Sequence, residues 1–337
     1  MTSWKELVDK AAGCLAGVAI GDAMGMPTTF YTPSQIKERF GIVDKFLDAP
    51  EDHPFHRGLK AGQVTDDTKI ALILAQTIIE VGEVSPEEFL KRLLNWIVAE
   101  RAAEKGLIGP STSKALERII SGGRMEEAGK YGTTNGASAR IPPVAIFDSS
   151  RRRELIKDTV SACIVTHNTN IAISAAMAVS FAIAKGVSGA NNLDLIIEEG
   201  VRGARIGVKF GTQLPSAPVH KRIRLALKLV SRARSMDQAI KYLYNYVGTG
   251  LESNEAIPTA FGIIKYVEGD LLRGISMAAN VGGDTDTIAA IVGGILGAFN
   301  GLKRFPREMV SFVENVNNLN FIDTAEKLLK VAMKSIM

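Results

Sequence analysis

The sequence predicts an all-α protein. Apolar residues recur with helical spacing along nearly all of its 337 residues, and no run of alternating β-branched residues is bounded by hairpin turns. Three segments, 11–20, 171–184 and 288–299, are apolar on almost every face and rich in Ala or Gly. Because such helices must be enclosed by close neighbours, we expect one compact multi-helix domain over residues 1–337.

The individual helices follow from their termini and their periodicity. The first covers 6–25, and the second starts at the capping residues 65–68 and ends near Gly82. The third has Ser85 as N-cap and Pro86 at its first position, with acidic residues in the first turn. Further helices are expected over 111–123, 153–167, 170–186, 192–207, 220–248, 252–269, 270–283 and 323–337.

Composition narrows the class of protein. The chain has 40 Lys+Arg against 36 Asp+Glu, and a net charge of +4 is too small to indicate a nucleic-acid partner. Both cysteines, Cys14 and Cys163, lie in apolar segments, which suits a reducing cytoplasm and not a disulfide framework. The N-terminus lacks the pattern of a signal peptide, and the apolar runs fall short of the roughly 18–20 residues that span a bilayer. We expect a cytoplasmic protein without membrane contact, and the oligomeric state is left open.

Two polar stretches precede apolar helices in the same way. Residues 65–68 read Thr-Asp-Asp-Thr, and residues 284–287 read Asp-Thr-Asp-Thr. Helix capping alone would explain either stretch, but a cap needs one oxygen or a reciprocal pair, and each stretch supplies two carboxylates and two hydroxyls. Carboxylates crowded at the mouth of a buried helix repel one another unless a cation compensates them. Oxygen donors of this kind favour Mg²⁺ or Mn²⁺ over Zn²⁺.

Five motifs, in this order, resemble those of the ADP-ribosylglycohydrolase family, which includes the dinitrogenase-reductase-activating glycohydrolases. They cover roughly residues 11–300, and the last is the most specific. The motifs are CLAGVAIGDAMGMP at 14–27, TDDT at 65–68, TNGASAR at 134–140, TH at 166–167 and GGDTDTIAAIVGGILGA at 282–298.

The resemblance implies an all-α hydrolase with two divalent cations, Mg²⁺ or Mn²⁺, that cleaves a bond at C1 of a ribose and releases ADP-ribose. The ligands it implies are Thr65, Asp66, Asp67, Asp284, Asp286 and Thr287. The substrate contacts it implies are Asn135, Gly136, Ala137 and His167, although His167 reads equally well as a buried structural histidine. Asp66 or Asp284 would take up the proton of the attacking water.

The sequence also departs from the family pattern. Many members carry Glu shortly after the Pro of the first motif, where this chain has Thr29, which cannot serve as a carboxylate base. The loop at 134–140 departs at its first and Met positions, and the NEAIPTA stretch resembles branches associated with small nucleoside-like compounds. The expected substrate is an ADP-ribosylated protein, and a small ribosyl compound is the alternative. A third alternative is a non-catalytic relative that only binds its partner. Such a protein would have no reason to keep six oxygen-bearing residues.

Several other polar residues are expected to have structural roles and not functional ones. Asp22 is expected to be a structural cap after the first inner helix. His53 and His56 are not expected to form a metal pair, because Pro54 breaks any helical geometry between them. The basic run 151–153 is expected to be a solvated surface.

Overall fold

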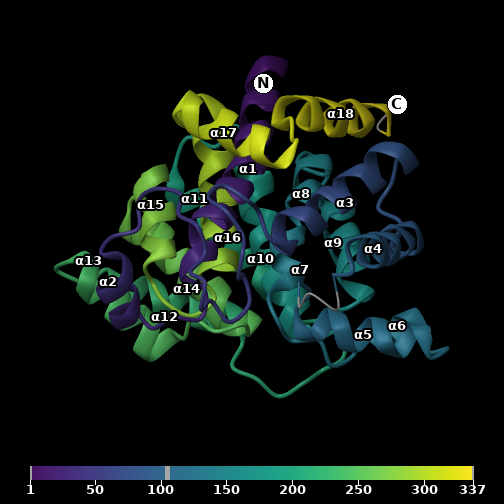
Figure 1. The fold of residues 1–337 in the computed structure, drawn as a ribbon. Coiled ribbons are helices and arrows are strands. Elements are labelled where there is room, and N and C mark those ends of the chain that lie inside the picture. Colours follow the sequence, from purple (N-terminus) through teal and green to yellow (C-terminus); the bar gives the residue numbers. More distant parts are fainter. Residues whose placement is uncertain (1, 103–106, 336–337) are drawn as a thin grey trace.

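The computed structural model describes residues 2–102 and 107–335 (Figure 1). Within these ranges the regular secondary structure is entirely helical, and the only β-type pairings are two isolated bridges. This confirms the all-α prediction. The α-helices are α1 (Trp4–Gly25), α2 (Pro33–Phe40), α3 (Asp66–Val81), α4 (Pro86–Glu100), α5 (Pro110–Ile120), α6 (Met125–Ala128), α7 (Gly136–Arg140), α8 (Pro142–Phe147), α9 (Arg152–Ile164), α10 (Asn170–Val187), α11 (Leu193–Gly207), α12 (Val219–Val230), α13 (Met236–Tyr242), α14 (Ser253–Tyr266), α15 (Leu271–Ala279), α16 (Thr285–Asn300), α17 (Arg307–Asn317) and α18 (Phe321–Lys334).

The three apolar segments form the inner helices α1, α10 and α16, as the sequence predicts. Nearly all of their side chains are buried, and the other helices surround them (Figure 1). Helices α1 and α16 approach so closely that a Cβ at Gly17 would collide with the carbonyl oxygen of Gly293, and a Cβ at Gly297 with that of Gly13. Glycine at these positions therefore allows the two backbones to touch, which fixes α16 against α1.

The predicted caps of α3 and α4 are confirmed. The Thr65 side chain accepts from the backbone N–H of Asp67, Gly82 ends α3 in the left-handed conformation, and Ser85 caps α4 with Pro86 at its first position. The single long helix predicted over 220–248 is wrong. Helix α12 stops at Val230, and Ser235 caps the separate helix α13, because the Ser235 hydroxyl offers the backbone a competing hydrogen bond. Five helices were not predicted: α2, α6, α7, α8 and α17. Helices α2 and α17 each have only one buried residue to signal them, and α6, α7 and α8 are too short to show a helical period.

Helix α10 has the length and composition of a membrane span, with 18 residues and a mean hydropathy of 1.6. It extends beyond the apolar run at 171–184, and 89% of it is buried among other helices, as is also true of the core helices of globular proteins. Both cysteines are free and buried, as expected. Burial raises the pKa of the Cys163 thiol to about 12, so this thiol stays protonated at neutral pH.

Candidate active site

The N-terminus of α3 is held in place by a carboxylate from α1. Asp22 accepts hydrogen bonds from the backbone N–H of Thr65, at 3.0 Å, and from that of Thr68, at 3.2 Å. It also accepts from the Thr68 hydroxyl. Asp22 is therefore a structural cap, as predicted, but it caps a neighbouring helix and not its own. This arrangement leaves Asp66 and Asp67, in the first turn of α3, free to face the same space.

The N-terminus of α16 is shaped by a tight turn. Gly282 and Gly283 both have positive φ, and a Cβ at Gly283 would collide with the backbone of Thr249. The N–H of Asp284 donates to the carbonyl of Thr249 at 2.7 Å, and the Asp284 side chain makes no cap bond to its own helix. It accepts instead from the amide of Asn135, so the loop before α7 meets the mouth of α16.

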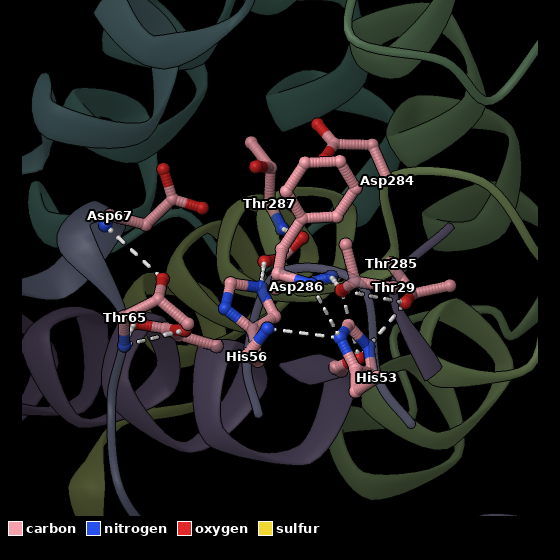
Figure 2. A network of polar contacts seen from close by, with 12 residues as sticks. Thr29, His53, His56, Thr65, Asp67, Asp284, Thr285, Asp286 and Thr287 are labelled. Carbon is pink, nitrogen blue, oxygen red and sulfur yellow. Dashed lines mark hydrogen bonds and ion pairs between the residues drawn. The ribbon is translucent and has the colours of Figure 1, made fainter. Parts of the chain in front are cut away.

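Asp286 has a different set of partners from Asp284 (Figure 2). Its Oδ2 lies 2.8 Å from Nε2 of His56, and its backbone N–H donates to the hydroxyl of Thr29 at 3.3 Å. The Thr29 hydroxyl also lies 3.2 Å from that of Thr285. The position where many family members carry Glu is thus filled by a buried hydroxyl in a hydrogen-bonded chain.

One cavity of about 480 Å³ joins these parts. Seven of the ten predicted site residues line it. They are Asp66, Asp67, Asn135, Gly136, Asp284, Asp286 and Thr287. The two polar helix mouths, more than two hundred residues apart in the chain, therefore open onto the same space. Its apolar wall includes Ile70, Leu107 and Leu251.

The other three predicted site residues lie behind the wall. Thr65 and Ala137 are buried, and His167 is completely inaccessible to solvent. Nε2 of His167 lies 3.0 Å from the Thr134 hydroxyl, and its Nδ1 lies 2.6 Å from the Thr166 hydroxyl. His167 thus contacts the 134–140 segment, which forms the short helix α7 after Asn135 and not a loop throughout, and the structural alternative describes its position better than a direct substrate contact. Burial, with the nearby Arg140 charge, holds its pKa well below the usual value.

The electrostatics of the cavity are dominated by repulsion among acidic groups. Burial, together with the charges of Asp286 and Asp22, raises the pKa of Asp66 to about 7. Burial and neighbouring carboxylates raise the pKa of Asp67 and of Asp284 well above the usual value. Burial opposes ionisation of Asp286 as well, but the hydrogen bond and charge of His56 outweigh it and lower the pKa of Asp286. Repulsion therefore acts on Asp66, Asp67 and Asp284, whereas Asp286 has a direct partner in His56.

The donor set fits a hard divalent cation. Four carboxylates and the hydroxyl of Thr287 line the cavity as oxygen donors, which Mg²⁺ and Mn²⁺ prefer, and a cation would relieve the repulsion. The Thr65 hydroxyl accepts from the N–H of Asp67 and does not line the cavity. Within residues 2–102 and 107–335, however, no three acidic, His or Cys side chains are gathered as a finished ligand set. Two of the carboxylates are turned to other partners: Asp284 to Asn135, and Asp286 to His56.

The cavity residues that the sequence did not predict include a histidine and two phenylalanines. His56, dismissed as half of a false metal pair, binds Asp286, and Phe30 and Phe55 stand at the cavity wall. The objection to a helical His53–His56 pair holds, because both lie in an irregular segment. An irregular segment has no periodic sequence pattern, so only its proximity to a motif could have indicated that it contributes to the site.

Comparisons with known proteins identify the family of the chain. The model of the ADP-ribosylglycohydrolase family matches residues 3–335. YegU of Escherichia coli K12 is 32% identical over 96% of this chain and 97% of its own. Tri1 of Serratia proteamaculans, named an ADP-ribosylarginine hydrolase, is 26% identical over 97% of this chain and 81% of its own. A solved structure of an ADP-ribosylglycohydrolase-related protein complex has the same fold, with a TM-score of 0.70 at 22% identity, over 98% of this chain and 100% of that one. The chain thus belongs to the ADP-ribosylglycohydrolase family, whose members are hydrolases acting on glycosyl compounds.

Proposed function

We propose that this protein hydrolyses the bond between C1 of ribose and a modified side chain, releasing ADP-ribose, and that it requires two divalent cations. The observation that carries the proposal is the convergence of four carboxylates from two helix mouths on one cavity, the two from the mouth of α16 buried and the two from α3 half-buried. Buried acidic groups that repel one another destabilise a fold, so they are expected only where function requires them. The family membership supplies the class of bond.

The proposed ligands are Asp66, Asp67, Asp284, Asp286 and Thr287, which line the cavity; Thr65, also expected from the sequence, lies outside its lining. Bound there, Mg²⁺ or Mn²⁺ would supply positive charge that orients the ribose hydroxyls and makes water more acidic near neutral pH. The remaining work belongs to the chain itself. Asn135 holds the Asp284 carboxylate, and His56 holds that of Asp286, which fixes the two oxygen donors of α16 before substrate arrives.

Hydrolysis at C1 passes through an oxocarbenium-like state, in which positive charge develops on the sugar. The carboxylates of the cavity stabilise this charge by proximity. Asp66 or Asp284 accepts the proton of the attacking water, a role for which Thr29 has no suitable group. The 134–140 segment, contacted by His167 at Thr134, would bind the ribose or phosphate through its backbone N–H groups.

The test is a substrate panel with Mg²⁺ or Mn²⁺ present. Purified protein is incubated with ADP-ribosyl-arginine, ADP-ribosyl-serine and nucleosides, and the products are separated by chromatography. Free ADP-ribose supports the proposal. Release of a free base alone would favour cleavage of a small ribosyl compound. If no product forms from any substrate and calorimetry detects no metal binding, a non-catalytic relative would be favoured.

A further inference from the structure

An exposed aromatic pair stands at the mouth of the cavity. The rings of Phe30 and Phe55 lie 4.6 Å apart, centroid to centroid, and are tilted by 49°. Their exposed fractions are 39% and 51%, although both residues line the cavity that holds the four carboxylates. Two large apolar rings left in contact with solvent beside a polar site are typical of a surface that a ligand covers.

The backbone that carries these rings is tied to the acidic site. Phe30 has a φ of +65°, a conformation that is unfavourable for a bulky residue. It is held by its N–H, which donates to the carbonyl of Gly283 at 2.6 Å, while the N–H of Gly283 donates to Tyr31. Phe55 directly precedes His56, whose side chain binds Asp286. The strained placement of Phe30 and the anchoring of Phe55 both depend on the mouth of α16.

The cavity therefore has two distinct sides. On one side Asn135 binds Asp284, and the short helix α7 begins directly after Asn135. On the other, His56 and Thr29 contact Asp286 (Figure 2), and the residues next to them in the chain are Phe55 and Phe30. A ribose held between the carboxylates would extend its ADP portion toward the 134–140 segment. Its leaving group would then point toward the aromatic pair.

We propose that Phe30 and Phe55 form the leaving-group subsite and select a flat, nitrogen-linked group over a hydroxyl-linked one. This inference rests on the proposed function. A guanidinium group presents a planar face that stacks on an aromatic ring and gains cation–π attraction, whereas a serine side chain presents no such face. In the reaction water adds its oxygen to C1, the C1–N bond breaks with its electron pair on nitrogen, and the nitrogen takes up a proton.

The test compares Phe30→Ala, Phe55→Ala and Phe30→Leu with the wild type. Tyr246→Ala is the matched control, because Tyr246 is 64% exposed and lies outside the cavity lining. Steady-state kinetics use ADP-ribosyl-arginine and ADP-ribosyl-serine, and calorimetry measures the affinity of the product ADP-ribose, which has no leaving group. Loss of one ring is expected to raise KM for ADP-ribosyl-arginine about five- to tenfold, with kcat little changed. Phe30→Leu should lose nearly as much, since it keeps the bulk but not the ring.

The affinity for ADP-ribose should stay within about twofold of the wild type in every variant, because the pair does not touch it. An equal loss of ADP-ribose affinity would place the adenine on the rings and overturn the inference. It would also be overturned by unchanged KM values, or by a wild type that prefers ADP-ribosyl-serine. In those cases the wild type still releases ADP-ribose and the proposed function stands. If the wild-type protein is inactive on both conjugates, the proposed function is wrong, and the inference falls with it.

Discussion

The two ends of helix α16 have opposite character. From Ile288 onward the helix packs through Gly293 and Gly297 against the backbone of α1, and these glycine contacts are buried and involve no charged side chain. Its first turn, equally buried, carries Asp284 and Asp286 next to two further carboxylates from α3. The first region lowers the free energy of the folded chain, while the second raises it. Buried charge at the mouth is therefore maintained for a purpose other than stability.

The largest effect is expected from removing charge at the mouth. Asp284→Ala should lower kcat/KM for the ADP-ribosyl substrate by more than about a hundredfold, since it removes a proposed ligand and proton acceptor. In EDTA the same variant should have an equal or higher Tm than the wild type, because one repelling carboxylate has gone. Calorimetric titration with Mg²⁺ should show weakened binding. Full activity in this variant would remove Asp284 from the proposed centre.

The complementary change adds volume to the uncharged end. Gly293→Ala would place a methyl group against the backbone of Gly17, and we expect it to lower the free energy of unfolding by about 1–3 kcal/mol. Gly294→Ala is the control, because its methyl would meet a side chain of Val18 and should cost less. Thermal denaturation measures both. Equal stability of Gly293→Ala and the wild type would show that the contact between α1 and α16 is not the tight one described.

The pH dependence of stability distinguishes the acidic mouth of α16 from its glycine-packed end without any mutation. Burial and neighbouring carboxylates raise the pKa of Asp66 from 3.8 in the unfolded chain to about 7, and the pKa values of Asp67 and Asp284 move the same way. The folded chain then binds more protons than the unfolded one between about pH 4 and pH 7, so stability should fall as the pH rises through this window. In EDTA the Tm should be higher at pH 5 than at pH 8.

Added Mg²⁺ should reduce this difference by favouring the ionised carboxylates, and Asp66→Asn should flatten the EDTA curve. A Tm in EDTA that rises from pH 5 to pH 8 would contradict the proposed repulsion.

The smallest effect is expected on the basic surface. Arg152 forms an ion pair with Glu199 at 2.6 Å, and its side chain is 53% exposed. Exposed pairs contribute little, so Arg152→Ala should change the free energy of unfolding by no more than about 0.5 kcal/mol and leave turnover unchanged. A large loss of activity would give this surface a role in binding substrate.

The sequence by itself determined the helical class, the three inner helices and the two acidic mouths. Each of these is a local pattern: apolar residues at helical spacing around Ile171 or Ile288, and capping residues at Thr65 or Ser85. The resemblance to family motifs then indicated that the two mouths meet. Local pattern failed at 220–248, where helical periodicity continues across a real break at Ser231.

Only the tertiary structure decided which groups meet across long separations. The pairing of Asp22 with the start of α3, of His56 with Asp286, and the exposure of Phe30 beside the cavity depend on how α1 and α16 lie together. A loop carries no periodicity, and hydrogen bonds between residues 230 positions apart leave no mark in composition. The chemical groups that each residue carries could be taken from the sequence. Their spatial neighbours could not, because neighbours are set by how the helices pack.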